Sequence, residues 1–517
     1  MNPQDAPVDR TLVEALRERL GQDAAAPVTL IETPISWVLL AGDLAYKLKK
    51  PVWLPFVDFR TLDARHRDCL EELRLNRRLA PALYLDVAPV CGSPQAPRIG
   101  GDGRAIDYAV RMRRFGAGEL LGERVARGEV RAPELAGLAR RMADFHATAP
   151  RAESGSDFAT PQRLQRTVQA LLEQLERALG RERLGPLRTW FGSQALALQE
   201  TWLARRAEGW VRECHGDLHL ANAVRLDGEL TAFDCVEFDP ALRWIDVMSD
   251  IAFLTMDLKA HGRADLAAAF LDDYLQCGGD YAGLAVLRFY EVQRALVRAV
   301  VACLQPPSGA GGGLAAPRDY LGLAERLAGA KGGAARLMIT HGLSGSGKST
   351  LARRLVEETG AIRLRSDVER KRLFGLQALQ RSAGQASDIY APDATRRTFE
   401  RLREGAALAL GAGFPVIVDG AFLRAQERER FHALALELAL PFTILSCRAD
   451  AEQLQRRVHE REAAGNDASE ADAEVVRRQR EFQEPLSPRE RRLSFEIDTG
   501  QPVDFAALAG RWLALRD

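Results

Sequence analysis

The sequence predicts two domains of different fold class, an α+β domain of two lobes over residues 1–330 and an α/β domain with a parallel sheet over residues 334–517. A chain of 517 residues is too long for one hydrophobic core and suits two or three domains. Hairpin patterns and amphipathic helices fill the first part, whereas strand and helix patterns alternate in the second. Residues 330–335 form the expected joint, and the proline- and glycine-rich residues 305–317 are an alternative linker.

The composition is that of an ordinary globular protein without a dominant charge. Basic and acidic residues balance at 71 each, so no global field favours long nucleic acid or an acidic membrane surface. The seven cysteines form no Cys-x-x-Cys pair, which fits reduced thiols better than a disulfide framework or a zinc site. The N-terminal segment lacks the pattern of a signal peptide, and no apolar run reaches the length of a membrane span. We therefore expect a cytoplasmic protein with no membrane partner and without long nucleic acid as a partner.

The first lobe begins with an amphipathic helix and a hairpin at residues 33–53, where two apolar runs flank the turn at residues 41–43. Lys47 and Lys49 occupy alternating positions of the second strand, so both side chains are expected on one face. The helix predicted at residues 64–80 follows. It carries Glu71 and Glu72 at its centre.

The second lobe contains the segment that predicts chemistry, residues 215–238. Two short alternating runs separated by Asp227-Gly228 are typical of a hairpin with a two-residue turn. This hairpin would bring Asn222 and Asp234 together, with Asp217 in the loop just before it. Such oxygen ligands suit magnesium bound to nucleotide phosphates, and one carboxylate is left to accept a proton from a hydroxyl nucleophile.

The α/β region opens with a phosphate-binding loop, GLSGSGKST, at residues 342–350. Its glycines allow the backbone N–H groups to cradle phosphates, Lys348 would reach the β- and γ-phosphates, and the hydroxyl of Ser349 would coordinate Mg²⁺. An apolar strand precedes the loop and a helix closed by Gly360 follows it, which is the context that the motif requires. The residues expected to bind ATP are Gly342, Ser344, Gly345, Ser346, Gly347, Lys348, Ser349 and Thr350.

Further candidates follow the loop. The buried strand pattern PVIVDG ends in Asp419, the expected second carboxylate at the magnesium shell. Asp367, at the end of another predicted strand, is placed to accept a proton from a substrate hydroxyl, and the basic residues 370–372 could hold an anionic group. Arg457 and Arg461 lie four residues apart on one helix face. They are either a lid over the transferring phosphate or part of a solvated basic face.

The residues His215-Gly216-Asp217, with Asn222 and Asp234, resemble the catalytic segment of the aminoglycoside phosphotransferase family, which has a bilobal protein-kinase-like fold. The resemblance implies a small lobe over about residues 1–115 and a large lobe over about 116–330. It also implies that Asp217 is the catalytic base and that Asn222 and Asp234 hold magnesium.

The same resemblance implies a lysine that pairs with phosphates and a glutamate partner for it. Lys47 and Glu72 are the candidates, with Lys49 and Glu71 as open substitutes. The segment YAVRMRRF, residues 108–115, resembles the hinge between lobes, with backbone groups near Val110 and Met112 meeting adenine.

Three further residues of the second lobe are expected to be structural. His215 and His219 fit hydrogen bonding to the backbone better than chemistry. Asp246 is expected to brace the catalytic loop or cap a helix.

The region after residue 334 resembles small P-loop kinases related to zeta toxins, polynucleotide kinases and gluconate kinases. By this resemblance Lys348 and Ser349 bind nucleotide and magnesium, and Asp367 is the base or a substrate ligand. It also makes Arg457 and Arg461 lid arginines. The whole chain resembles fusions of an aminoglycoside-phosphotransferase-like domain with such a kinase domain.

The sequence thus predicts a tandem kinase in which each fold uses ATP and Mg²⁺ to phosphorylate a hydroxyl group of a small metabolite. An ATP-driven regulatory switch is one alternative, although the base candidates Asp217 and Asp367 argue against it. A toxin-like or nucleic-acid-end kinase is another, and the zero net charge argues against it. The acceptors are not identified by the sequence.

Overall fold

The computed structural model describes residues 10–54, 57–304, 319–330, 335–382, 389–464 and 467–515. Contacts divide the chain into two compact units, the first of residues 1–130, 145–167 and 202–254, and the second of residues 131–144, 168–201 and 255–517. Helices with residues in both units are α4 (Ala132–Thr148), α5 (Pro161–Leu179), α7 (Gln199–Ala207) and α9 (Val247–Ala260). Most of the expected joint and the alternative linker lie outside the described residues, so the boundary near residues 330–334 stays a prediction.

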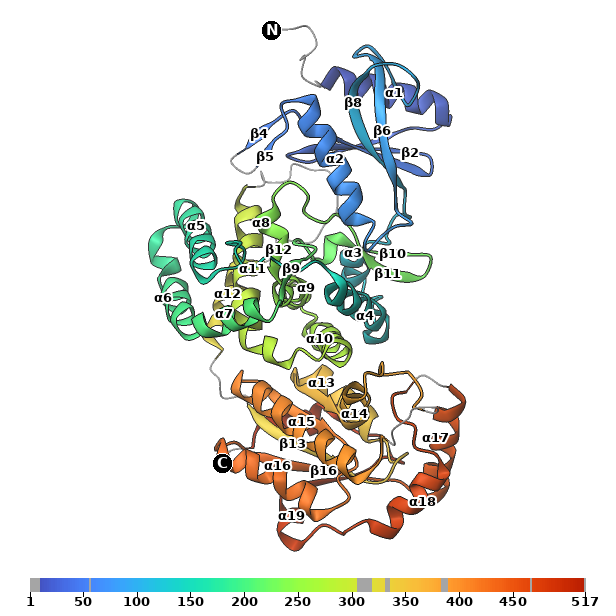
Figure 1. The fold of residues 1–517 in the computed structure, drawn as a ribbon, viewed down its shortest axis with the longest axis vertical. Coiled ribbons are helices and arrows are strands. Elements are labelled where there is room, and N and C mark those ends of the chain that lie inside the picture. The colour runs from blue at the N-terminus through green and yellow to red at the C-terminus, as the bar shows by residue number, and fades with distance from the viewer. Residues whose placement is uncertain are drawn as a thin grey trace. The chain divides into compact units, whose positions relative to one another are not determined.

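The first unit contains a six-stranded antiparallel sheet with the strand order β1-β2-β3-β8-β6-β7 (Figure 1). These strands are β1 (Thr29–Glu32), β2 (Ser36–Ala41), β3 (Leu44–Lys49), β6 (Tyr84–Ser93), β7 (Ala96–Ile99) and β8 (Ala105–Arg113). The first unit also contains the helices α1 (Arg10–Ala24), α2 (Leu62–Asn76), α3 (Leu121–Ala126) and α8 (Pro240–Arg243) and the 3₁₀ turn η2 (Leu220–Asn222). Its short strands include β4 (Trp53–Leu54) and β5 (Val57–Asp58).

The two faces of this sheet have different partners because side chains alternate along each strand. On one face, Leu16 of α1 lies in a buried cluster with Leu39 and Leu48. On the other face, Cys69 of α2 packs in a cluster with Ala45. The alternate positions of β3 that follow Ala45 therefore point towards α2, and they hold two lysines.

The adenine contact expected at the backbone of Val110 and Met112 is wrong. Both residues lie inside β8, which is paired with β3 on one side and β6 on the other. Their backbone groups are therefore committed to the sheet ladder and are not available for adenine. The chain leaves the sheet only after Arg113.

Three short antiparallel pairs complete the described part of the first unit: β9 (Val211–Glu213) with β12 (Trp244–Asp246), β10 (Ala223–Leu226) with β11 (Glu229–Ala232), and β4 with β5. The second pair is the hairpin expected from the sequence. Asp227 and Gly228 have φ angles of 50° and 90°, so a two-residue turn with both residues in the left-handed region connects its strands.

The second unit contains a five-stranded sheet with the order β14-β15-β13-β16-β17, and all of its pairings are parallel. Its strands are β13 (Arg336–His341), β14 (Ile362–Arg365), β15 (Pro415–Asp419), β16 (Phe442–Arg448) and β17 (Ser494–Asp498). The accompanying helices are α13 (Lys348–Thr359), α14 (Ser366–Leu373), α15 (Pro392–Gly411), α16 (Ala425–Glu437), α17 (Ala451–Ala464), α18 (Ala473–Phe482), α19 (Pro488–Arg492) and α20 (Phe505–Leu513). The fold class predicted for both regions is confirmed.

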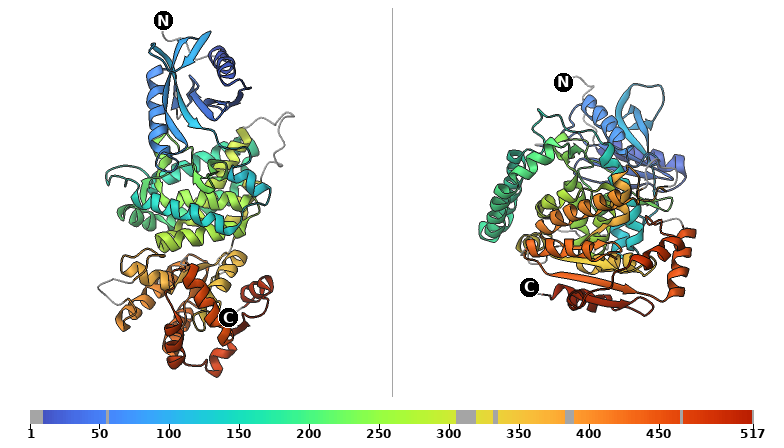
Figure 2. Two further views of the ribbon diagram at one scale, coloured as in Figure 1. Left: turned by 90° about the vertical axis from the view of Figure 1, so that its right-hand side faces the viewer. Right: turned by 60° about the horizontal axis from the view of Figure 1, so that its bottom comes forward.

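Helices cover both faces of the parallel sheet (Figures 1 and 2). Met338 and Ile417 on one face share a buried cluster with Leu355 of α13 and Trp512 of α20. On the opposite face α15 packs against β14 and β15, and α16 packs against β13. The result is the α/β/α layering that a parallel sheet requires, since both of its faces must be buried.

The second unit also contains α6 (Arg181–Ala197), α10 (Ala264–Gly278), the 3₁₀ turn η3 (Tyr281–Gly283), α11 (Leu284–Leu304) and α12 (Tyr320–Gly329). As expected from its apolar spacing, α12 packs back on α11 and α6. Helix α10 contacts α13 and β14, so it extends the helical layer on the α13 face of the parallel sheet (Figure 1). Within the described part of the chain, no helix combines the length and hydropathy needed to cross a membrane.

We predict that Trp512→Ala lowers the free energy of unfolding by about 3–5 kcal/mol, because it empties a fully buried position between α20 and the sheet. Leu513→Ala, at the neighbouring and 38% exposed position, is the matched control and should cost well under about 1 kcal/mol. Urea unfolding followed by far-ultraviolet circular dichroism measures both changes. Equal effects of the two substitutions would contradict the buried role of α20.

Candidate active sites

In the first unit, Lys47 links the sheet to the segment that carries the candidate magnesium ligands. Its Nζ lies 2.9 Å from Oε1 of Glu72 on α2 and 2.6 Å from Oδ1 of Asp234. Lys47 and Asp234 are 187 residues apart in the sequence. Asp234 follows the second strand of the hairpin β10–β11, which places it beside Lys47. The structure therefore brings together the lysine, the glutamate and one metal candidate named from the sequence.

Lys49 lies in a second, fully buried group of charges. Its Nζ is 2.8 Å from Asp68 and 2.6 Å from Glu72, and it also contacts Glu237. Glu72 therefore bridges both lysines. Glu71, the open substitute for Glu72, points elsewhere and pairs with Arg74 and Arg243.

The charges of this network shift one another's pKa values. Burial alone would raise the pKa of Glu72, but the two lysines outweigh burial and hold it below its usual range. Burial raises the pKa of Glu237, and Lys49 opposes this shift. Burial would lower the pKa of Lys47, but Asp234 and Glu72 outweigh it and keep this ammonium charged. The lysines are thus held as cations at the end of the site where phosphates are expected.

Asp217, the candidate base, is oriented by its neighbours. Its Oδ2 accepts a hydrogen bond of 2.8 Å from Nδ2 of Asn222 and lies 3.3 Å from Nε2 of His219. His219 also accepts from the backbone of Ala221 and begins η2. His215 is buried and its Nε2 lies 2.8 Å from the carbonyl oxygen of Phe233, which fits the structural role expected for it.

The backbone at Asp234 is held in an unusual conformation. Its φ of 63° is in the left-handed region, which non-glycine residues seldom adopt outside sites that need it. The hydroxyl of Tyr84 accepts a hydrogen bond from the N–H of Asp234, and Oδ1 of Asn76 accepts one from the N–H of Cys235. Two side chains of the small lobe therefore fix the direction of this carboxylate.

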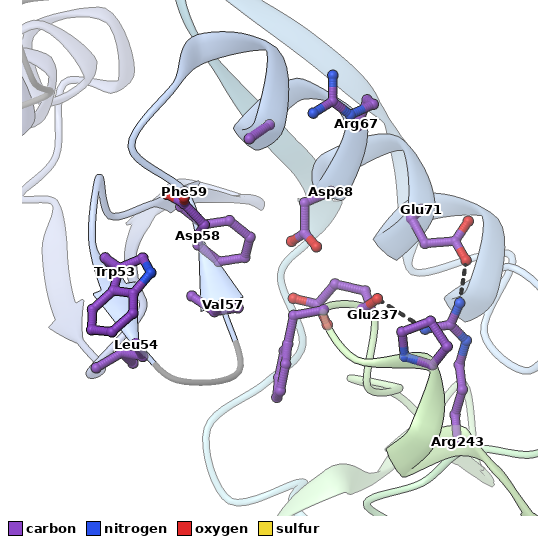
Figure 3. A pocket seen from close by; sticks show the side chains of 13 residues that line it. Trp53, Leu54, Val57, Asp58, Phe59, Arg67, Asp68, Glu71, Glu237 and Arg243 are labelled. Carbon is purple, nitrogen blue, oxygen red and sulfur yellow. Dashed lines mark hydrogen bonds and ion pairs between the residues drawn. The ribbon is translucent and has the colours of Figure 1, made fainter. Parts of the chain in front are cut away.

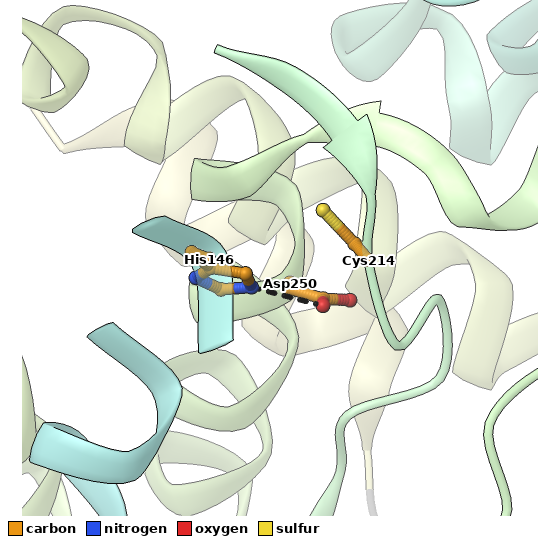
Figure 4. Close-up of side chains that lie close together, drawn as sticks. All are labelled: His146, Cys214 and Asp250. Atoms are coloured by element: carbon orange, nitrogen blue, oxygen red, sulfur yellow. Dashed lines mark hydrogen bonds and ion pairs between the residues drawn. The ribbon is translucent and has the colours of Figure 1, made fainter. Parts of the chain in front are cut away.

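Asp250, which sequence reasoning missed, braces the loop that holds the candidate base. Its carboxylate accepts hydrogen bonds from the backbone N–H groups of His215 and Gly216 at 2.7 and 2.8 Å. Nε2 of His146 lies 3.3 Å from Oδ2 of Asp250 (Figure 4). The potential ligand atoms of Cys214, Asp250 and His146 lie within 4.8 Å of one another, so this trio could hold a metal ion by distance alone. Because both carboxylate oxygens already bind the loop backbone, we interpret the trio as a brace.

Asp246 was the residue expected to brace this loop or cap a helix. Its carboxylate pairs with Arg205 and accepts from the N–H of Met248 at the start of α9, so it caps the helix. Asp250 is one helical turn further along the same segment, and this spacing was the available signal.

A pocket of about 510 Å³ lies beside the Lys49 group, between α2 and the chain around α8 (Figure 3). Asp68 and Glu237 line it, together with the aromatic side chains of Trp53, Phe59 and Phe238. Neither Asp217 nor the candidate metal ligands belong to its lining, so it is a separate space from the candidate site of phosphoryl transfer.

In the second unit, the loop between β13 and α13 has the backbone that its glycines permit. Gly342 and Gly345 have φ angles of 136° and 83°. A Cβ at Gly342 would lie 2.4 Å from the carbonyl oxygen of Cys447, and one at Gly345 would lie 2.8 Å from that of Leu454. Other residues are therefore excluded at both positions, and the loop keeps a cradle of backbone N–H groups.

Ser349 and Asp419 meet at the carboxyl end of the sheet. The hydroxyl of Ser349 lies 3.1 Å from Oδ1 of Asp419. Oδ2 of Asp419 is buried without a hydrogen-bond partner. A hydroxyl beside an incompletely satisfied buried carboxylate is a donor set that fits Mg²⁺ and its water shell.

The phosphate-binding groups already have protein partners. Nζ of Lys348 donates to the carbonyl oxygen of Leu343 at 2.7 Å, and the N–H of Ser344 donates to Oε1 of Gln479 on α18 at 2.9 Å. Burial lowers the pKa of Lys348. Bound phosphates would have to replace these two contacts.

Arg457 and Arg461 lie on α17, as predicted, and both have partners. Arg457 donates to Thr499 at 2.8 Å and approaches the carbonyl oxygen of Gly345 at 3.4 Å, so it lies at the phosphate loop. Arg461 donates to the carbonyl oxygen of Ala471. Asp367 is half-buried in the first turn of α14, two residues after β14 ends.

The basic residues 370–372 are all engaged within the protein. Arg370 donates to Thr395 and the carbonyl oxygen of Ile389, Lys371 pairs with Glu470, and Arg372 contacts Glu369. They give no separate sign of an anion site.

Two family models match the chain. The model described as "Phosphotransferase enzyme family" matches residues 56–290, and the model described as "AAA domain" matches residues 337–486. An uncharacterized protein of Mycobacterium tuberculosis is 32% identical over 451 residues, which cover 86% of this chain and 88% of that protein. An uncharacterized protein of Mycobacterium bovis matches with the same values. The chain thus joins a phosphotransferase-family domain to a P-loop domain.

Solved structures with similar parts include a choline/ethanolamine kinase family protein from Mesorhizobium loti, 14% identical with a TM-score of 0.37, over 61% of this chain and 92% of that one. A gluconokinase from Sinorhizobium meliloti is 21% identical with a TM-score of 0.25, over 35% of this chain and 91% of that one. The expected relation to zeta toxins and polynucleotide kinases stays a prediction.

We predict that Glu72→Gln destabilises the first unit by about 3–5 kcal/mol, because it removes a buried negative charge shared by two buried lysines. Glu71→Gln is the matched control on the same helix. It removes a half-buried charge from arginine pairs and should cost about 1 kcal/mol or less. Thermal unfolding followed by circular dichroism distinguishes them, and a larger loss for Glu71→Gln would refute the central position of Glu72.

We also predict an acid-sensitive second unit. Burial, with Arg428 and Lys348 nearby, lowers the pKa of His341 to about 4, whereas the unfolded chain has an ordinary histidine pKa of about 6.5. Below about pH 6.5 the unfolded state therefore binds more protons, and the free energy of unfolding falls by up to about 1.4 kcal/mol per pH unit down to about pH 4.

The variant His341→Asn keeps a polar group facing Ser446 and removes the titration. Its urea midpoint should depend less steeply on pH between 6.5 and 4 than that of the wild type. Parallel pH profiles would show that His341 does not contribute.

Proposed function

This chain belongs to the same protein family as the uncharacterized mycobacterial proteins, and from this premise we propose that it is a tandem ATP- and magnesium-dependent kinase. Each domain would transfer the γ-phosphate of ATP to a hydroxyl group of a small metabolite. The observation that carries the proposal is that each of two unrelated folds gathers a lysine and carboxylates: Lys47 pairs with Glu72 and Asp234, and Lys348 lies within electrostatic reach of Asp419 and Asp367. A regulatory nucleotide switch would not need base candidates in both.

In the first domain we assign the base to Asp217, which Asn222 and His219 orient. A carboxylate in this position accepts the proton of the attacking hydroxyl. Lys47, anchored by Glu72, would hold the α- and β-phosphates, and Asn222 and Asp234 would hold magnesium. The ion pair between Lys47 and Asp234 supports these assignments, because it brings a phosphate-binding cation next to a metal-binding carboxylate.

In the second domain the loop residues Gly342 to Thr350 would bind ATP, with Lys348 at the β- and γ-phosphates. Ser349 and Asp419 would hold magnesium, and Asp367 would accept the proton of the hydroxyl. Arg457 and Arg461 would neutralise charge on the transferring phosphate. The contact of Arg457 with the phosphate loop supports its part of this assignment.

Magnesium, when bound, supplies positive charge to the phosphate oxygens and aligns them for in-line transfer. The protein's own groups supply position and proton transfer. The lysines hold the phosphates, the aspartates receive the proton, and the buried carboxylates keep the lysines charged.

The test is transfer of radiolabelled γ-phosphate from ATP into a small-molecule cell extract by the full chain. Asp217→Asn should lower the yield of one labelled product, and Asp367→Asn and Lys348→Ala the yield of another, by about 100-fold or more. Asp63→Asn and Asp393→Asn change exposed aspartates in helical first turns and serve as matched controls.

Products that each depend on one domain would establish the tandem kinase and identify its acceptors. If only free phosphate is labelled with every variant, the acceptor hypothesis fails and an ATP-driven regulatory switch is the better account. If the label appears at nucleic-acid ends, the acceptor is a polynucleotide and the metabolite assignment is wrong.

A further inference from the structure

Arg363 is a buried arginine at the phosphate-loop site of the second unit that no sequence pattern singled out. It lies on the edge strand β14 and its side chain is 4% exposed. Neighbouring Leu364 faces α15, where a Cβ on Gly405 would lie 2.5 Å from it, so Arg363 faces the opposite, α13 side of the sheet.

On that side Arg363 is held by α10, a helix within the region matched by the phosphotransferase family model. Its Nη2 lies 2.7 Å from Oδ2 of Asp272, which is 3% exposed. Nε2 of Gln276, one helical turn further along α10, donates to the backbone carbonyl oxygen of Arg363 at 2.6 Å. Both the side chain and the backbone of this residue are therefore tied to the same helix face.

The second terminal nitrogen of the guanidinium group, Nη1, faces the candidate magnesium ligands. Nη1 donates to the carbonyl oxygen of Ser349 at 3.3 Å and lies 3.8 Å from Oδ2 of Asp419. This is the carboxylate oxygen that has no hydrogen-bond partner. Arg363 thus connects Asp272 to the two residues that would hold magnesium.

The loss of either partner from this buried ion pair would cost free energy of folding. A buried guanidinium without a partner is costly, and removal of one partner from a buried ion pair destabilises the protein strongly. Burial would lower the pKa of Arg363, but Asp272 and Asp419 outweigh burial and raise it, so the group stays a cation. Without Asp272, Asp419 would be the negative partner left within ion-pair distance of the guanidinium, with a weaker contribution from Asp273, and the guanidinium would be drawn towards Asp419.

Further contacts keep α10 in register with the site. Arg372 of α14 donates to the carbonyl oxygen of Gln276 at 2.6 Å, where a cation complements the C-terminal end of the helix. The hydroxyl of Tyr281 donates to Glu369 of α14 at 3.1 Å. The helix that carries the base candidate Asp367 is therefore tied to α10 as well.

We infer that Asp272 is a positioning residue of the second active site. It holds Arg363 so that the guanidinium orients Asp419 and the first turn of α13 but does not move closer to the carboxylate of Asp419. The role presupposes the kinase function proposed for this site. A helix of the phosphotransferase-family region then supplies part of the P-loop site, and magnesium use by the P-loop site depends on that helix.

The test measures magnesium-dependent binding of the fluorescent nucleotide mant-ATP to the full chain at pH 7.5. Binding to the second site is taken as the part of the fluorescence signal that the variant Lys348→Ala lacks. Asp272→Asn should raise the half-saturating Mg²⁺ concentration about tenfold, as loss of an outer partner of a metal site does. Affinity for mant-ATP without magnesium should change by less than about twofold, since the phosphate loop itself is untouched.

The matched control is Asp273→Asn, the same change at the next position of α10. Asp273 pairs with Arg353 on α13 and acts on Arg363 only through longer-range charge, so its variant should change the half-saturating Mg²⁺ concentration much less than Asp272→Asn does. Arg363→Met should reproduce the effect of Asp272→Asn, and the double variant should add little, because the two residues act as one unit. Arg363→Lys keeps the charge but lacks the forked geometry, and it replaces Arg363→Met if that variant does not fold.

The positioning role is overturned if Asp272→Asn binds magnesium like the wild type or like Asp273→Asn. It is also overturned if binding with and without magnesium weakens equally, which would indicate a merely structural pair. If the wild type shows no binding that depends on Lys348, the proposed kinase function of this site fails, and the role of Asp272 falls with it.

Discussion

The structure of the first unit depends on one constraint, that a buried charge must have a buried partner. Glu72 lies between two ammonium groups, and the alternation of side chains along β3 is what brings Lys47 and Lys49 to the same face. The network reaches Asp234 through Lys47 and Glu237 through Lys49. The proposed binding of phosphates and a divalent cation would need charges that keep their positions without ligand, and such a network provides them.

The second unit meets the same constraint differently. Its parallel sheet is apolar in the interior, and the charged groups collect at the carboxyl ends of the strands, as in other open α/β sheets. Asp419 and Ser349 meet there, and Arg363 faces them from the edge strand. An edge strand leaves backbone groups without a partner strand, but here Gln276 of α10 bonds the carbonyl oxygen of Arg363, and the same helix packs on β14. The same helix therefore both covers the sheet and places charge beside the candidate magnesium ligands.

Much of this was predictable from the sequence, and the rest has a common reason for being missed. The phosphate loop, its flanking strand and helix, and the hairpin after Asp217 are local patterns, and the structure contains each of them. The hinge at Val110 was misplaced because one sequence does not show which strands will flank β8. Asp272 and Arg363 are 91 residues apart, so no spacing links them. The chemical roles of the named residues stay predictions.

The contacts of α10 have a consequence for building chimeras from this chain. A helix that covers the P-loop sheet must present an aspartate and, one turn later, a glutamine to Arg363, while its terminal carbonyl groups face Arg372. Exchange of the first domain for that of another phosphotransferase would keep the second domain intact only if the incoming helix carried these groups. The unit that can be transplanted therefore begins before α10, inside the region that sequence families assign to the other enzyme.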